Sequence, residues 1–289
     1  MRYFVSILVF FLSLSFGLAQ NNRTFTVNGV SFKMIYVDGG TFTMGCTSEQ
    51  SDCDADEKPA HSVTVSNFYM GETEVTQVLW HLVMGTEPTA YGGWTEEFGV
   101  GSFYPAYRVS WDECQQFCEK LNQMCRRQLP PGYHFALPTE AQWEYAARGG
   151  NKSKGYLYSG SNTLEDVAWY WQNSGDNFMT GTDADWNWDK IQENHGKTHP
   201  VKRKSPNELG LYDMSGNVWE WCADIYDAQY YEFTTDSDPL WNPSFGGSTR
   251  VNRGGSWINY ASRSRVADRD NDGPDTRDGN LGLRLVLVK

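Results

Sequence analysis

Residues 210–221 read Gly-Leu-Tyr-Asp-Met-Ser-Gly-Asn-Val-Trp-Glu-Trp, and the rest of the chain is best interpreted from this stretch. Gly216 and Asn217 are a turn signal, because glycine and asparagine adopt positive φ at the least cost. The aromatic residues around the turn predict a packed loop rather than a solvated one. Two interpretations remain open. The first is a tightly packed core loop, which the spacing alone favours, and the second is a cation site in which Asp213 and Glu220 meet carbonyls exposed by the turn.

Six further short motifs occur in order along the chain. They are residues 42–45 (FTMG), 74–77 (EVTQ), 109–111 (VSW), 137–145 (LPTEAQWEY), 253–257 (RGGSW) and 282–285 (GLRL). With residues 210–221 they resemble the signature of the formylglycine-generating enzyme (sulfatase-modifying factor) family. The resemblance implies one α+β domain over residues 20–289 with the C-type-lectin-like fold, much irregular structure, few short strands and about three helices. It does not by itself decide the activity, because one fold hosts many functions.

The composition limits the classes of partner. The chain has 289 residues and a net charge of −12. This charge argues against nucleic acid or an anionic membrane surface as a partner, because both attract a basic face. Twelve Trp, 16 Tyr and 15 Phe supply enough apolar area for a sizeable core, although only 39% of the residues are hydrophobic.

Residues 1–19 have the pattern of a secretory signal peptide. Arg2 precedes an apolar run over residues 4–16, and the small residues Gly17 and Ala19 fall at positions −3 and −1 of the predicted cleavage site. The run is short for a membrane span, so no integral span is expected after cleavage. We therefore expect an exported protein, located in the periplasm, on the cell surface or outside the cell.

All six cysteines follow this signal. An even number of cysteines in an oxidising compartment favours disulfides over metal sites. Cys46 and Cys53 bracket a short acidic loop and are the pair that closes most easily. The partners of the other four remain open, and plain burial is the alternative for Cys114 and Cys118.

Three helices are predicted from their end signals. Thr76 caps a short helix that Gly85 stops. Capping boxes at residues 110–113 and 139–142 open two further helices. Residues 176–195 look like an insertion relative to the family. Its two tryptophans suggest either a ligand platform or a self-packed surface loop, and the second is favoured.

The residues expected for oxidase chemistry are missing. In formylglycine-generating enzymes a pair of cysteines just after the Arg-Gly-Gly-Ser-aromatic motif holds copper and activates oxygen. A thiolate pair suits Cu(I), and hydroxyl or amide groups do not replace it. The matching positions carry Asn259 and Ser264 (or Ser262, if the gap is placed differently), and no cysteine follows Cys222. Copper is therefore not expected.

The C-terminal segment that replaces this active site is rich in polar and aromatic side chains. It resembles the variable region of diversity-generating-retroelement target proteins, which are lectin-fold binders of the same family. Tyrosine, serine and asparagine make adaptable binding surfaces. The alternative is an ordinary polar surface loop. The predicted ligand-binding residues are Ile258, Asn259, Tyr260, Ser262, Ser264, Asp268, Asp270, Asn271, Asp272, Thr276, Asp278 and Asn280.

Three arginines lie within the same segment. Arg265, Arg269 and Arg277 are expected to form salt bridges inside the protein. This arrangement would leave Tyr260 and the asparagines to contact the ligand.

The resemblance also implies a structural calcium ion. Family members hold it with the side chains that match Asp213 and Glu220, and with the backbone carbonyls that match Gly216 and Val218. An oxygen cage of this type fixes an irregular loop.

These observations predict an exported, non-catalytic protein that binds a protein, peptide or glycan ligand through its C-terminal loop. Two alternatives remain. One is an oxidase that converts a sulfatase residue to formylglycine. The other is a structural component of a cell-surface, gliding-type machine.

Overall fold

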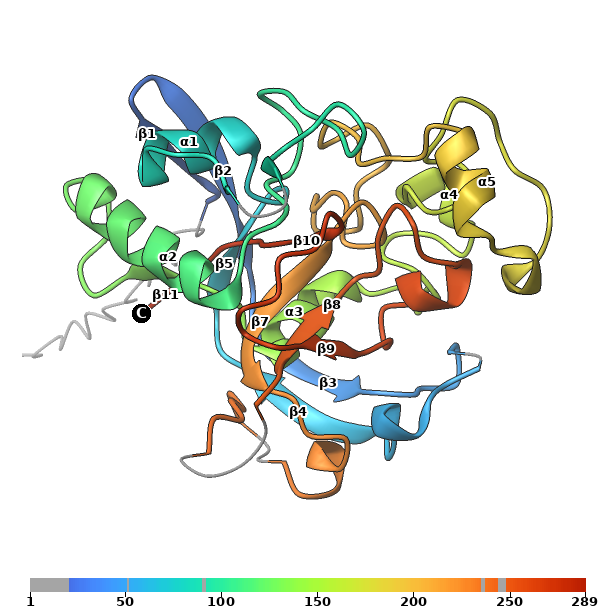
Figure 1. Cartoon of the computed structure of the whole chain (residues 1–289). Helices are drawn as coiled ribbons and strands as arrows, with labels where there is room; N and C mark the ends of the chain where they lie inside the picture. The colour runs from blue at the N-terminus through green and yellow to red at the C-terminus, as the bar shows by residue number, and fades with distance from the viewer. Residues whose placement is uncertain (1–20, 51, 90–91, 235–236, 244–247) are drawn as a thin grey trace, which may run out of the picture.

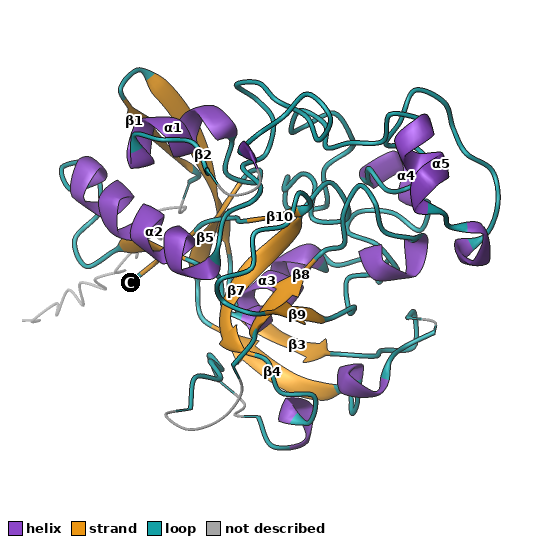
Figure 2. Cartoon of the chain, viewed as in Figure 1, coloured by secondary structure: helices purple, strands orange, loops and turns teal. Residues whose placement is uncertain are grey.

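Figure 1 shows the computed structural model of the chain, which describes residues 21–289 except 51, 90–91, 235–236 and 244–247. The predicted signal peptide, residues 1–19, lies outside the described residues. Short helices and strands are joined by long loops, drawn in teal in Figure 2. The predicted α+β fold with much irregular structure is confirmed.

Within the described residues the strands form three sheets. The largest has the order β1-β2-β5-β11-β6, so that the last strand of the chain pairs with strands from its first half. The second has the order β10-β7-β8-β9, with β10 and β7 parallel, and β3 pairs with β4. The strands are β1 Arg23–Val27, β2 Val30–Val37, β3 Gly40–Met44, β4 His61–Val65, β5 Phe68–Gly71, β6 His134–Ala136, β7 Trp219–Ile225, β8 Arg250–Arg253, β9 Asp270–Asp272, β10 Leu281–Gly282 and β11 Val286–Val288.

Five α-helices occur in the part of the chain that the structure describes. They are α1 Gln77–Met84, α2 Trp111–Cys125, α3 Glu140–Ala147, α4 Leu164–Val167 and α5 Trp188–Glu193. The first three are the helices that the end signals predict, and the two additional ones are short. None of these helices combines the length and the apolar character needed to cross a membrane.

Both predicted capping boxes are present. Ser110 Oγ accepts from the backbone N–H of Glu113 at 3.2 Å, and Glu113 Oε2 accepts from the backbone N–H of Ser110 at 2.9 Å. Thr139 and Gln142 make the same reciprocal pair at the start of α3. These bonds satisfy backbone donors that a helix start leaves unpaired, which fixes where α2 and α3 begin.

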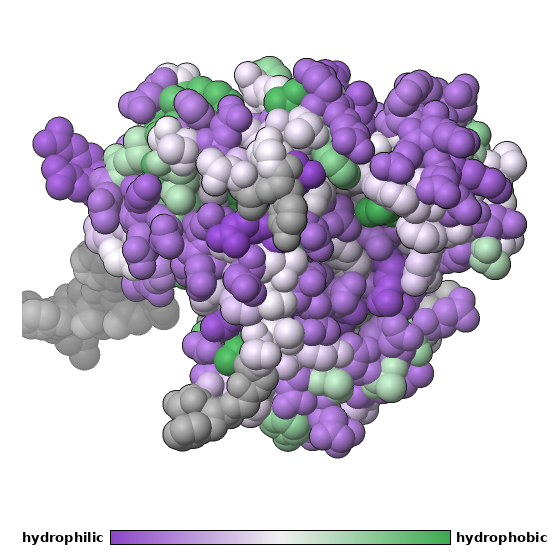
Figure 3. All heavy atoms as spheres, viewed as in Figure 1, coloured by the Kyte–Doolittle hydropathy of each residue, from purple (hydrophilic) through white to green (hydrophobic). Residues whose placement is uncertain are grey.

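Aromatic side chains dominate the core. Trp80 of α1 stacks on Phe117 of α2 with ring centroids 5.2 Å apart, and the two helices lie beside the five-stranded sheet in Figure 1. Trp143 of α3 is wholly buried in a second cluster. The face seen in Figure 3 is mainly hydrophilic, with hydrophobic residues in small scattered groups.

One disulfide joins Cys46 and Cys53, as predicted, and both residues lie in the connection between β3 and β4. The other four cysteines are free and buried. The argument from an even number of cysteines is therefore wrong for these four, and plain burial accounts for them. Burial raises the pKa of the Cys118 thiol to about 12, so this thiol is inert at neutral pH.

Candidate functional site

The turn predicted within residues 210–221 is present. Asp213, Gly216 and Asn217 have φ angles of 57°, 77° and 64°, in the left-handed region. A Cβ atom at Gly216 would lie 2.3 Å from the carbonyl oxygen of Trp169, so only glycine fits there. The turn points Asn217 inward, where its Nδ2 donates to Glu74 Oε2 at 2.8 Å.

Three carboxylates, those of Glu74, Asp213 and Glu220, lie buried around this turn. Arg284 donates to both oxygens of Glu220 at 2.7–3.0 Å. Asp213 Oδ2 accepts a backbone N–H at 2.9 Å, whereas its buried Oδ1 has no hydrogen-bond partner among the described residues. Burial raises the pKa of Asp213 to about 6, and burial together with the neighbouring carboxylates raises the pKa of Glu74. The cluster thus sets three acidic groups against one arginine.

Most of the predicted ligand-binding residues reach the surface, and we call this set the C-terminal face. It consists of Ile258, Asn259, Tyr260, Ser262, Asp270, Asn271, Asp272, Thr276, Asp278 and Asn280. Ser264 and Asp268 do not belong to it, because their exposed fractions are 0% and 1%. Asp268 points inward to Arg263 and Arg265, at 3.4 Å from each. The prediction that Ser264 and Asp268 contact a ligand is corrected accordingly.

The C-terminal face has two parts, each next to a pocket. Asp270 and Asn271 line a polar pocket of about 520 Å³ with Tyr226. Ile258 and Asn280 line an aromatic pocket of about 320 Å³. One part therefore offers mainly hydrogen-bonding groups and the other mainly apolar contact.

Arginine side chains hold this segment in place. The ion pairs are Arg265–Glu57, Arg269–Glu140 and Arg277–Glu113, with N–O distances of 2.6, 2.7 and 3.0 Å. The prediction of internal salt bridges is confirmed, and the partners come from distant parts of the chain. The buried guanidinium of Arg253 also donates to the carbonyls of Val266 and Ala267 at 3.1 and 2.9 Å. The backbone beneath the C-terminal face is therefore fixed from several directions.

The predicted insertion packs against the C-terminal face. The carboxylate of Asp183 accepts from the backbone N–H groups of Ala261 and Ser262 at 3.0 and 3.3 Å. Trp186 Nε1 donates to the carbonyl of Ile258 at 2.6 Å. In Figure 1 the yellow insertion accordingly lies beside the orange-red C-terminal segment. The insertion therefore packs on the C-terminal segment as well as on itself.

The family model described as "Sulfatase-modifying factor enzyme 1-like domain" matches residues 20–289. The chain belongs to this family. The Chaperone protein LppX of Paenibacillus barcinonensis is 34% identical over 294 residues, which cover 90% of this chain and 91% of that protein. The formylglycine-generating enzyme of Streptomyces coelicolor is 29% identical, over 87% of this chain and 88% of its own length. Among solved structures, the Treponema denticola variable protein 1 is 33% identical with a TM-score of 0.69, over 92% of this chain and 98% of that one.

Amide and hydroxyl groups occupy the positions at which the family's oxidases are expected to carry their thiol pair. Asn259 Oδ1 accepts a short hydrogen bond from Ser256 Oγ, which in turn accepts from Asn280 Nδ2 at 3.0 Å. Ser264 Oγ is buried and has no hydrogen-bond partner among the described residues. The free thiols of this chain lie on α2 and β7 and are all buried. Residues 259 and 264 therefore offer no thiolate pair of the kind that suits Cu(I).

A structural calcium ion of the kind that the family resemblance implies fits this site only in part. Asp213 offers a buried oxygen without a partner, and the cluster has excess negative charge. Both oxygens of Glu220, however, are already bound by Arg284, and Trp143 Nε1 also donates to it at 2.7 Å. Glu74, which the sequence analysis missed, is a further buried carboxylate beside the turn; the motif at residues 74–77 contained the signal for it.

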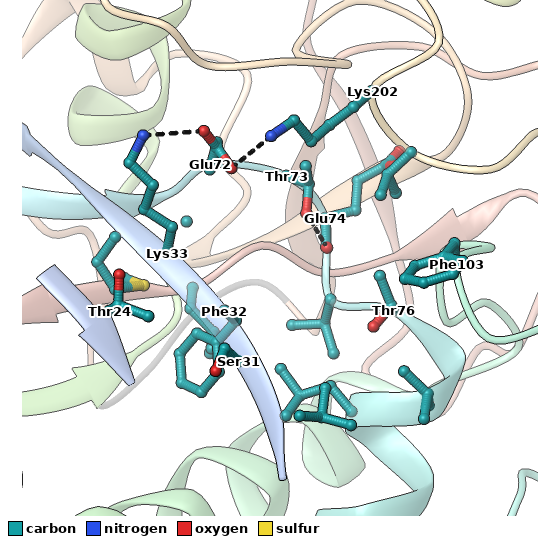
Figure 4. A pocket seen from close by; sticks show the side chains of 18 residues that line it. Thr24, Ser31, Phe32, Lys33, Glu72, Thr73, Glu74, Thr76, Phe103 and Lys202 are labelled. Carbon is teal, nitrogen blue, oxygen red and sulfur yellow. Dashed lines mark hydrogen bonds and ion pairs between the residues drawn. The ribbon is translucent and has the colours of Figure 1, made fainter. Parts of the chain in front are cut away.

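An apolar pocket of about 340 Å³ lies away from the C-terminal face, beside α1 and β2 (Figure 4). Lys33 and Lys202 reach the same carboxylate, that of Glu72, at 3.1 and 2.8 Å. One carboxylate thus pairs with both lysines, and the rest of the pocket offers mainly apolar contact. We do not place the functional site here.

Proposed function

We propose that this protein is an exported, non-catalytic binding protein that takes a protein, peptide or glycan ligand on its C-terminal face. The observation that carries the proposal is the combination of outward polar and aromatic side chains with a backbone fixed by buried arginines. Asn271 and Thr276 illustrate it, because their side chains make no hydrogen bond with the described residues. They are free to bond to a ligand.

Preorganisation strengthens this interpretation. A loop that must be ordered on binding loses affinity through conformational entropy, whereas a loop already held in place does not. Arg265 and Arg269 are buried and paired with carboxylates from distant parts of the chain. The C-terminal face therefore combines adaptable side chains with a rigid support, as binding loops on a scaffold do.

One structural neighbour and the substituted thiol positions support a binding role over an oxidase role. The Treponema denticola variable protein 1 is similar over nearly the whole chain, and its printed name is consistent with a scaffold that presents a variable surface. Asn259 and Ser264 replace the thiol pair that the oxidase alternative requires. The net charge of −12 disfavours nucleic acid as the ligand.

The test is a binding screen with matched variants. The chain without residues 1–19 is screened on glycan arrays and on displayed peptides and proteins. The double variant Tyr260→Ala/Asn271→Ala is expected to weaken binding of a selected ligand at least tenfold. Met124→Ala, an exposed side chain on α2, is expected to leave it unchanged. Equal loss in both variants would contradict the assignment to the C-terminal face.

A second assay separates binding from oxidation. The purified protein is loaded with copper and mixed with a cysteine-containing peptide, and dioxygen consumption is followed. We expect no turnover, because the soft ligand pair is missing. Stoichiometric copper uptake with peptide oxidation would replace the binding proposal with the oxidase alternative.

A chaperone-type role is a second candidate, favoured by the 34% identity with a protein named as a chaperone. In this case the ligand would be an unfolded or partly folded protein. Suppression of client aggregation at equimolar protein would support it. Insensitivity of that suppression to Tyr260→Ala/Asn271→Ala would place such a function outside the C-terminal face.

A further inference from the structure

A cavity of about 320 Å³ lies between the insertion and the loop that contains residues 96–98. We propose that this cavity binds a quaternary ammonium group. The inference rests on the proposed binding function and names a ligand class for one part of that site. Three aromatic rings line the cavity: Phe98, Trp188 at the start of α5, and Trp257. The aromatic pocket next to Ile258 shares the same three rings, so both openings lead to one aromatic cluster.

The rings are arranged as a box. Trp257 is almost wholly buried, and its ring centroid lies 5.9 Å from that of Phe98 and 6.1 Å from that of Trp188. The interplanar angles are 64° and 48°, so the two outer rings are tilted against a common floor. Several ring faces around one cavity attract a cation through the negative charge on each π face.

The box is held open by its surroundings. The carbonyl of Phe98 accepts from both the N–H and the Oγ1 of Thr198, at 3.2 and 2.6 Å. Ile191 is 1% exposed and anchors α5 in the core, which fixes Trp188 one helical turn earlier. Trp257 Nε1 donates to the carbonyl of Gly279 at 3.2 Å. Binding therefore requires little reordering of the walls.

The charges at the two openings favour a cation. Glu96 and Glu97 line one opening and Asp278 the other. Against these three carboxylates stand Lys197, which also lines the cavity, and Arg108, whose guanidinium carbon lies 4.6 Å from the Phe98 ring centroid. These five groups leave a balance of one negative charge, and Arg108 already contacts the Phe98 ring through a cation–π interaction.

The aromatic lining selects the type of cation. A primary ammonium has three N–H donors that need acceptors, and the three aromatic rings of the lining offer no oxygen acceptor. A quaternary ammonium has no donor to satisfy and is recognised by aromatic cages. The carboxylates at the openings disfavour an anionic group beside the ammonium, so choline suits the site better than a zwitterionic phosphocholine headgroup.

The test is calorimetric titration of the chain without residues 1–19 with choline chloride, phosphocholine and 3,3-dimethylbutan-1-ol, the uncharged isostere of choline. We expect saturable choline binding, at least tenfold weaker binding of the isostere, and weaker binding of phosphocholine than of choline. Trp188→Ala is expected to weaken choline binding at least fivefold, and Trp188→Phe to retain most of it. Phe178→Ala, an insertion aromatic that is 55% exposed and outside the cavity, is the matched control.

The outcomes are separable. Equal affinity for choline and its isostere, or unchanged choline binding in Trp188→Ala, would overturn the inference and leave a purely hydrophobic pocket or none. If choline fails to bind while Tyr260→Ala/Asn271→Ala still abolishes binding of a screened ligand, only this inference fails. If choline binds and no screened ligand depends on the C-terminal face, the proposed macromolecular function fails and the ammonium site stands.

Discussion

Replacing Glu220 with glutamine tests whether the motif around residues 210–221 is held by an ion pair. Glu220 is 1% exposed and Arg284 0%, and three of the four bonds to the carboxylate come from this arginine. Glutamine has nearly the same shape, but it leaves the buried Arg284 without its main counter-charge. It also places its own amide N–H group against another hydrogen-bond donor. Breaking a buried pair in this way costs about 3–5 kcal/mol, which lowers the melting temperature by roughly 6–20 °C.

The assay is urea unfolding followed by tryptophan fluorescence, in a chelator so that calcium does not contribute. Glu72→Gln is the matched control, because Glu72 also forms ion pairs, but with two lysines that are about 40% exposed. The cost of this variant is expected to be below about 1 kcal/mol. Adding Arg284→Met to Glu220→Gln is expected to recover part of the loss, since the guanidinium that Glu220→Gln leaves without its main partner is then removed. A cost for Glu220→Gln no larger than that for Glu72→Gln would refute the reasoning.

Three further outcomes are expected. Chelation of calcium is expected to lower the melting temperature of the wild type. Asp213→Asn is expected to remove this response, and asparagine suits the positive φ of the position. Differential scanning calorimetry with and without calcium checks both. Burial, and next to it the charge of Glu140, raise the pKa of Asp224 to about 7. Between about pH 4 and pH 7 the folded protein therefore keeps a proton that the unfolded chain loses. The free energy of unfolding falls as the pH rises through this range, by at most about 1.4 kcal/mol per pH unit. Urea unfolding at each pH should show a smaller slope for Asp224→Asn. Replacing Cys46 and Cys53 by serine opens a loop with a sequence separation of 7 and is expected to lower the free energy of unfolding by about 2–3 kcal/mol, as urea unfolding would measure.

Local signals predicted the helices well. The reciprocal side chain–backbone bonds of a capping box involve residues three positions apart, so residues 110–113 and 139–142 contain all the information that starts α2 and α3. Gly85 likewise ends α1 in the left-handed conformation. Thr76 precedes α1 as predicted, although its side chain makes no capping bond. Here the position was right and the proposed mechanism was not.

Long-range pairings escaped prediction because composition does not specify partners. The two carboxylates of the motif suggested a cation site, but Glu220 is bound by an arginine 64 residues away. The tryptophans of the insertion suggested a ligand platform, whereas Asp183 of the same insertion bonds to the backbone N–H of Ala261, 78 residues later. Ser264 and Asp268 were assigned to the binding face because they are polar, and only the packing around them placed them inside.

The C-terminal segment explains how a surface with little regular structure can be rigid and adaptable together. In a strand, neighbouring backbones satisfy one another, whereas here the guanidinium of Arg253 satisfies the carbonyls of Val266 and Ala267. Buried arginines, together with the pairing of β9 with β8, hold the backbone of this segment. Outward side chains such as Asn271 and Thr276 are therefore not needed to hold it. Stability and recognition thus depend on different residues of one segment. A scaffold built in this way can change what it binds without changing how it folds, and its binding residues can be replaced at little cost in stability.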